Sequence, residues 1–162
     1  MKKIKIALIG SGKVAEEYIR VIKEFKVLQI VALVSKRIES SREKSVKFKI
    51  PFYGISVDKM MIEVVPDVVI VCVSPSSTKQ VCLKLFKFDC LTLIEKPMGL
   101  NLIEANKILH AAQKFKRKAF VALNRRFYSS TLLLKRKISK LKKIKRVVTV
   151  IDQESTINAK KN

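Results

Sequence analysis

Cysteine is scarce in this chain, and its spacing fits neither a disulfide framework nor a zinc site. The three cysteines are Cys72, Cys82 and Cys90, an odd number without a Cys-x-x-Cys pair. Disulfide scaffolds carry an even set of cysteines, and zinc sites use closely spaced pairs of ligands. We therefore expect no metal, and three free cysteines that are buried as small apolar side chains.

Long apolar runs are also missing. A membrane-spanning helix needs about 20 consecutive apolar residues, and no segment of the chain approaches that length. The positively charged start is followed by an apolar run, Ile6–Ile9, that stops at Gly10, so no secretory signal fits. The sequence predicts a cytoplasmic protein with no membrane partner.

Acidic residues are few, since 13 Asp and Glu stand against 35 Lys and Arg and give a net charge of +22. Such an excess attracts polyanions without specifying a fold. The densest basic segment, Lys135–Arg146, has no interleaved aromatic residue and no accompanying nucleic-acid motif. Leu134, Ile138 and Leu141 share one helical face, which is typical of a helix with a solvated cationic face. A basic nucleic-acid-binding protein stays an alternative, but we do not expect that partner.

The chain does have enough apolar residues to form a hydrophobic core, since they make up 48% of its 162 positions. Short apolar runs alternate with helix-like stretches. The predicted strands cover 4–9, 28–34, 51–53, 67–73, 91–94 and 119–123, and the predicted helices cover 13–26, 40–48, 58–64, 76–86 and 101–115. Along the first helix, apolar residues recur at helical spacing at Val14, Tyr18, Val21, Ile22 and Phe25. Strands and helices in this order predict an α/β fold, a doubly wound parallel sheet with helices on both faces.

A glycine-rich turn joins the first strand to the first helix. Its sequence, Gly10-Ser11-Gly12-Lys13-Val14-Ala15, is G-x-G-x-x-A. The first glycine permits a tight turn, the second lets the backbone approach a pyrophosphate, and the small Ala15 lets the helix pack close to the strand. Free N–H groups at the helix start then face the anion. The turn predicts a Rossmann dinucleotide site at Gly10, Ser11, Gly12, Lys13 and Val14.

The end of the second strand bears on which dinucleotide is bound. An NAD site usually places a carboxylate there for the ribose hydroxyls. Here the sequence continues with Ser35, Lys36 and Arg37, and no acid follows before Glu39. A hydroxyl and two cations suit a 2′-phosphate. The cofactor is therefore expected to be NADP or NAD, with NADP favoured.

Four motifs in this order resemble the Gfo/Idh/MocA oxidoreductases. They are the glycine-rich turn at 10–15, Asp67-Val68-Val69-Ile70-Val71-Cys72-Val73-Ser74-Pro75, Glu95-Lys96-Pro97 and Asn124-Arg125-Arg126-Phe127. The resemblance implies a Rossmann domain followed by an α/β substrate domain. It also implies hydride transfer between a nicotinamide and the hydroxyl of a sugar, a cyclitol or a nucleotide-linked sugar.

The resemblance also implies roles for single residues. Lys96 would be the catalytic residue, bonding the substrate hydroxyl and helping to move its proton, since an ammonium stabilises a developing alkoxide. The implied cofactor contacts are Glu95, which braces the turn and approaches the ribose, Ser74 and Pro75 over the cofactor, and Asn124 and Arg126 on the nicotinamide side or at the domain junction.

The chain departs from the family pattern in two side chains and in length. Lys79 stands where the family usually has His, and Asp89 where it often has Gly. Members are roughly twice as long, as two domains require, and their usual catalytic histidine lies beyond this chain. His110 is expected to be a structural or surface residue.

We expect residues 1–123 to form the NAD(P)-binding domain and 124–162 to be only the start of a truncated substrate domain, with a strand over 146–153. A strand without its sheet would expose an apolar edge. The chain would then need a homo-oligomer or a complementing chain for full activity. A noncatalytic dinucleotide-binding module or scaffold is the alternative.

Overall fold

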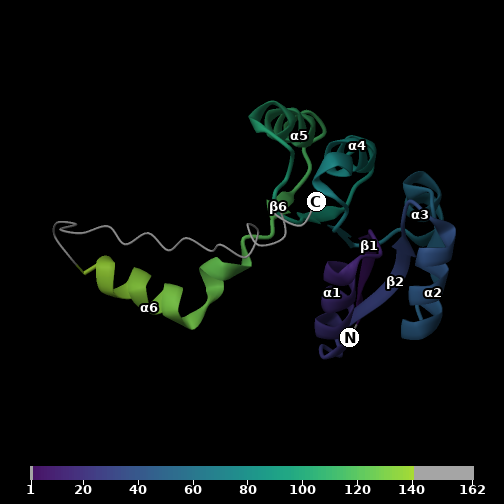
Figure 1. The fold of residues 1–162 in the computed structure, drawn as a ribbon, viewed down its shortest axis with the longest axis horizontal. Helices are drawn as coiled ribbons and strands as arrows, with labels where there is room; N and C mark the ends of the chain where they lie inside the picture. Colours follow the sequence, from purple (N-terminus) through teal and green to yellow (C-terminus); the bar gives the residue numbers. More distant parts are fainter. Residues whose placement is uncertain (1, 141–162) are drawn as a thin grey trace, which may run out of the picture. The chain divides into compact units, whose positions relative to one another are not determined.

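The computed structural model describes residues 2–140. The chain divides into two compact units, Met1–Leu123 and Asn124–Asn162. The first unit, of which β1, β2 and β6 are labelled in Figure 1, is one parallel sheet with the strand order β3-β2-β1-β4-β5-β6. Its strands are β1 (Ile4–Ile9), β2 (Leu28–Val34), β3 (Phe52–Gly54), β4 (Val68–Val71), β5 (Leu91–Ile94) and β6 (Ala119–Val121). The predicted doubly wound parallel sheet is confirmed.

Five helices of this unit connect the strands and cover both faces of the sheet. They are α1 (Lys13–Lys23), α2 (Ile38–Phe48), α3 (Val57–Val64), α4 (Pro75–Leu85) and α5 (Leu102–Lys114). Side chains of β1 alternate between the faces: Ile6 and Leu8 pack in the cluster that holds α1, whereas Ala7 and Ile9 pack in the cluster of α3, α4 and α5. This period of two explains why the central strands are apolar throughout.

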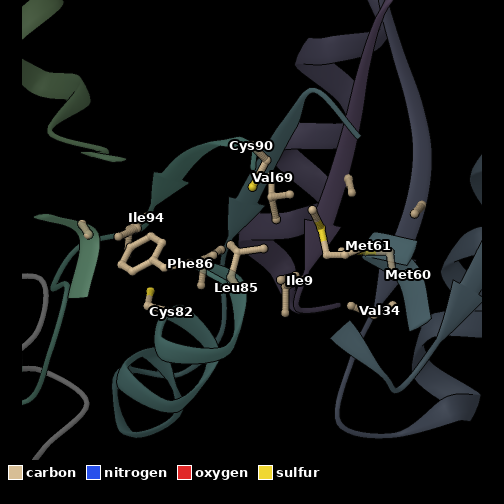
Figure 2. Close-up of a cluster of buried hydrophobic side chains, with 14 of the residues drawn as sticks. Ile9, Val34, Met60, Met61, Val69, Cys82, Leu85, Phe86, Cys90 and Ile94 are labelled. Carbon is tan, nitrogen blue, oxygen red and sulfur yellow. The ribbon is translucent and has the colours of Figure 1, made fainter. Parts of the chain in front are cut away.

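The larger of the two cores lies under α3, α4 and α5. Figure 2 shows Phe86 and Met60 at opposite sides of this cluster, with Leu85 and the strand residue Val69 between them. These four side chains are 0% exposed. Burying a side chain of this size contributes about 1.5–3 kcal/mol, so each of these side chains stabilises the unit substantially.

The buried face of α1 differs from the predicted stripe. Ala15, Ile19 and Ile22 are the buried residues of this helix. Of the predicted apolar residues, Val14, Val21 and Phe25 are about half exposed, with exposed fractions of 48%, 53% and 52%. Two overlapping apolar stripes run along this helix, and the close approach of Ala15 to the sheet selects the one that is buried.

Several element ends were also predicted wrongly. The first helix ends at Lys23 rather than 26, because the chain turns into β2 through the bond from the Leu28 N–H to the Phe25 carbonyl. The next helix begins at Ile38, two residues before the predicted start. The fourth strand stops at Val71, so Cys72 and Val73 leave the sheet.

An ionic link joins α1 to α2. The carboxylate of Glu16 accepts bonds from Lys44 at 2.7 Å, Lys47 at 2.9 Å and Arg20 at 2.8 Å. These hydrogen bonds, that of Lys44 first, lower the pKa of Glu16 to about 2. A single acid thus neutralises part of the dense positive charge between the two helices.

Three further predictions concern the cysteines, His110 and the apolar runs. All three cysteines are free and buried, as expected. His110 is exposed on α5, which confirms a surface position. Within residues 2–140, no helix is both long and apolar enough to cross a bilayer.

The second unit is described only up to residue 140. It contains a short 3-10 helix, η1 (Asn124–Phe127), and the helix α6 (Ser129–Ile138), which has no buried residue. The predicted strand over 146–153 and the basic positions after 140 lie outside the described residues. The assignment of 124–162 to the start of a substrate domain stays a prediction.

Candidate functional site

A cavity of about 870 Å³ opens at the carboxyl ends of β1, β2 and β4. Strand β1 lies between β2 and β4, and the connections that leave these strands run on opposite faces, which is where open α/β sheets bind ligands. A cavity of this size accommodates a cofactor-sized molecule. Its lining includes Ile9, Gly10, Ser11, Gly12, Val34, Ser35, Lys36, Arg37, Ser56, Asp58, Cys72, Ser74, Ser77, Gln80, Val81 and Lys84.

Gly10 is required by the fold itself. Its φ is +115°, a conformation that L side chains rarely adopt, and a Cβ at this position would lie 2.3 Å from the Cys72 carbonyl oxygen. Its N–H donates to the Val34 carbonyl at 2.8 Å. The first glycine of the turn therefore fixes the close approach of β1, β2 and the end of β4.

Gly12 has no such structural requirement. It is the N-cap of α1 with φ −73° and ψ −174°, which any residue adopts, and no side chain caps the helix there. A Cβ added to Gly12 would meet nothing within 4 Å. The unbonded N–H groups at the start of α1 thus adjoin open space, the arrangement that binds phosphate.

The residues after β2 give this cavity a positive wall. Ser35 is nearly buried, and its hydroxyl donates to the Arg37 carbonyl at 2.6 Å, which fixes the turn. Lys36 and Arg37 are exposed and line the cavity. Among the lining residues, Asp58 is the single carboxylate. The cavity therefore favours an anionic ligand.

A face of α4 that the sequence reasoning missed lines the opposite side. Ser77, Val81 and Lys84 follow one another at helical spacing after Ser74. Extending the predicted site from Ser74 along the period of the helix would have found them. Pro75, the first residue of α4, is not among the lining residues, nor are Lys13 and Val14 at the start of α1.

Glu95 and Lys96 follow β5, outside the lining of the cavity. The Glu95 N–H donates to the Val71 carbonyl at 2.9 Å. One carboxylate oxygen of Glu95 accepts from the Tyr18 hydroxyl at 2.6 Å, and the other accepts from the Lys96 N–H at 3.1 Å. Burial, and next the bond to Glu95, raise the pKa of Tyr18 above its ordinary value, so its hydroxyl stays a donor.

Lys79, in the place of the family's usual histidine, pairs with another helix. Its ammonium bonds Glu104 of α5 at 2.5 Å, and Glu104 also accepts from the Leu100 N–H at 3.1 Å. The bond from Lys79 is the main cause of a lowered pKa of Glu104. This side chain therefore fastens α4 to α5 and is not among the residues lining the cavity.

Asn124 and Arg126 belong to η1 of the second unit, so their approach to a cofactor stays a prediction. The Arg126 guanidinium lies 6.0 Å from the centroid of the Phe127 ring. No group of three or more His, Cys, Asp and Glu within residues 2–140 could hold a metal ion.

A doubly wound sheet with a glycine turn at the start of α1 and an anion-favouring cavity at its switch point defines the class of Rossmann dinucleotide-binding domains. The family model described as oxidoreductase family, NAD-binding Rossmann fold (Gfo/Idh/MocA) matches residues 4–123. The chain belongs to this family.

Solved structures agree with the fold. Similar ones are the WlbA dehydrogenase from Chromobacterium violaceum in complex with NADH and UDP-GlcNAcA (20% identity, TM-score 0.79, 86% of this chain and 41% of that one), an NAD binding oxidoreductase from Klebsiella pneumoniae (19%, 0.77, 85% and 39%) and a myo-inositol 2-dehydrogenase from Lactobacillus plantarum (15%, 0.76, 85% and 41%). The chain spans about two fifths of the length of these structures. No curated protein matches the sequence.

Proposed function

We propose that this chain binds a nicotinamide dinucleotide in the cavity, with its pyrophosphate at Gly10, Ser11 and Gly12 and at the N-terminus of α1. The observation that carries the proposal is Gly12. The backbone at this position does not need glycine, whereas a phosphate group close to it does. Lys13 and Val14 would contribute backbone N–H groups from the first turn of the helix.

The proposed dinucleotide is NADP in preference to NAD. Lys36 and Arg37 supply two cations next to the buried Ser35, where a 2′-phosphate would be bound. Lys84 adds positive charge from α4. Asp58 is the lining carboxylate that would serve the ribose hydroxyls of NAD instead.

The proposed chemistry is oxidation or reduction at a hydroxyl-bearing carbon of a sugar, a cyclitol or a nucleotide-linked sugar. The bound cofactor supplies the hydride acceptor or donor. Lys96 would donate a hydrogen bond to the substrate oxygen and stabilise its developing negative charge. A nucleotide-linked sugar is consistent with the ligand of the WlbA dehydrogenase structure.

Other site residues would position these groups. The Glu95 carboxylate would hold the backbone at Lys96 by accepting a hydrogen bond from the Lys96 N–H. Ser74 and Pro75 would cover the cofactor at the start of α4, and Asn124 and Arg126 would approach the nicotinamide side. As a macromolecular partner we propose a second copy of the chain or a complementing chain.

The substitution Gly12→Ser tests cofactor binding without harming the fold. Serine is a favoured N-cap residue and has room here, so the melting temperature without ligand should stay equal or rise. Its side chain would occupy the approach of the pyrophosphate, so the Kd for NADPH and NADH should rise at least about tenfold, as a loss of about 1.4 kcal/mol implies.

Isothermal titration calorimetry of the wild type and Gly12→Ser with NADPH, NADH and ATP tests both the pyrophosphate site and the preference for NADP over NAD. Tighter binding of NADPH than of NADH supports the 2′-phosphate site, and Arg37→Glu should reverse that preference. Equal binding of all three nucleotides to both proteins would show general attraction to anions and would refute the site.

A noncatalytic dinucleotide-binding module is the second candidate. It is favoured by the position of Lys96, which follows β5 outside the residues that line the cavity. Spectrophotometric assays of NADP and NAD reduction with a panel of polyols and sugars distinguish the oxidoreductase from the noncatalytic module. Binding without turnover, also in the presence of any complementing chain, supports the module, and turnover by this chain alone excludes it.

A further inference from the structure

We propose that Tyr18 is a positioning residue for Lys96 and acts through Glu95. This inference rests on the proposed role of Lys96. The residues come from distant parts of the sequence, Tyr18 from the middle of α1 and Glu95 directly after β5. No family motif quoted above includes Tyr18, and the structure places it against the motif that carries Lys96.

The first step is the strength of the bond between Tyr18 and Glu95. The hydroxyl and the carboxylate oxygen are 2.6 Å apart, within the range of charge-assisted O–H···O⁻ bonds. The Tyr18 ring packs against the cluster formed by α1 and the sheet, which limits its movement. A half-buried donor on a rigid helix therefore holds one oxygen of Glu95 in a single position.

The second step leads from Glu95 to Lys96. Because one oxygen is held by Tyr18, the other is directed at the Lys96 N–H, which it accepts at 3.1 Å. The carboxylate thus bridges α1 and the backbone from which the Lys96 side chain projects. Without the hydroxyl, Glu95 is free to rotate toward one of the many ammonium groups of this basic chain, including that of Lys96.

A neutral donor suits this position for an electrostatic reason. A lysine or arginine in place of Tyr18 would also bond Glu95, but it would add a positive charge close to Lys96 and oppose its ammonium. Tyr18 holds the carboxylate without that charge. Because Tyr18 belongs to α1, whose N-terminus faces the proposed pyrophosphate site, it also ties the position of Lys96 to that of the cofactor.

The far end of the loop that carries Lys96 is fastened separately. Glu104 accepts from the Leu100 N–H, and Lys79 holds Glu104 from α4. The Glu95 backbone is held by its bond to Val71, so the peptide N–H of Lys96 is the part of the loop that Tyr18 controls through the Glu95 carboxylate. Loss of the Tyr18 hydroxyl should therefore change the backbone at Lys96 and spare that at Leu100.

The test is Tyr18→Phe, which removes the hydroxyl and keeps the ring, studied in the full chain by amide hydrogen exchange with NMR detection. The exchange rate of the Lys96 amide should rise roughly tenfold, the effect expected for loss of a bond to a charged group, while that of Leu100 stays unchanged. Tyr53→Phe is the matched control, because Tyr53 lies on the edge strand β3, away from Glu95.

Two further measurements separate positioning from general damage. In a Glu95→Ala background, Tyr18→Phe should have no additional effect on the Lys96 amide, since coupled residues are not additive. The Kd for whichever of NADPH and NADH binds more tightly should rise about threefold or more in Tyr18→Phe. The Kd for the matching ADP-ribose fragment, which lacks the nicotinamide, should not change.

Each outcome decides one question. An unchanged Lys96 amide in Tyr18→Phe, or additive effects with Glu95→Ala, overturns the inference. If neither dinucleotide binds the wild type, the proposed function fails, and the exchange rates still decide whether Tyr18 controls the backbone at Lys96. Weaker binding of the ADP-ribose fragment as well would show that the substitution disturbs α1 as a whole, which also overturns the inference.

Discussion

Replacing Gly10 by alanine should destabilise the first unit strongly. The φ of +115° would cost an L residue about 2 kcal/mol. The new Cβ would lie 2.3 Å from the Cys72 carbonyl oxygen, and relieving that overlap requires a backbone shift that costs about 2 kcal/mol more. We expect the free energy of unfolding to fall by about 4 kcal/mol, since the two effects are separate in origin.

The assay is thermal and urea unfolding of the chain without ligand. A loss of about 4 kcal/mol corresponds to a Tm roughly 15 °C lower for a unit of this size. Gly12→Ser is the matched control, because a side chain at Gly12 meets nothing within 4 Å and the backbone there is ordinary. It should melt within about 3 °C of the wild type.

A Gly10→Ala protein that melts within about 3 °C of the wild type would refute the reasoning. It would show that the turn relaxes without cost, and that glycine is needed at both positions for the ligand alone. Equal destabilisation by both substitutions would contradict the distinction between a glycine that the fold needs and one that the ligand needs.

Two further predictions concern charge and burial. Because hydrogen bonds from Lys44 and Lys47 hold the pKa of Glu16 at about 2, below the 4.5 of a free carboxyl, the carboxylate stabilises the fold above pH 4.5 and this contribution is lost as the pH falls toward 2. The Tm of Glu16→Gln should therefore depend less on pH in that window, and an unchanged pH profile at low salt would count against the ionic link. Burial raises the pKa of Cys72 to about 12, so its thiol should react with iodoacetamide at pH 8 only after unfolding, and rapid labelling of the folded chain at this residue by mass spectrometry would contradict its burial.

Much of the fold could be predicted because its central strands are apolar on both faces. The run around Val69 reads as a central parallel strand, and the glycines after Ile9 identify the turn that follows β1. The buried face of α1 could not be predicted in the same way. This helix carries Val14 and Val21 beside Ile19 and Ile22, so its hydrophobic pattern is compatible with more than one orientation.

The candidate site could be predicted where it depends on local sequence. The turn at Gly10 and Gly12 and the cations after β2 are contiguous segments, and the structure brings them to one cavity. Lys84 was missed because it reaches the cavity only through the direction of α4, and Tyr18 because its partner lies 77 residues away. Such contacts follow from the order of the strands and leave no local pattern.

The lining of the cavity comes from one continuous part of the sequence. Every lining residue falls between Ile9 and Lys84, whereas the loop with Lys96 and everything after it come later in the chain. A substitution later in the sequence would leave the identity of every lining side chain unchanged, so the pocket is encoded as one block. Recombination or fusion at a point after residue 84 would exchange Lys96 and all that follows it and keep the same set of cavity-lining side chains.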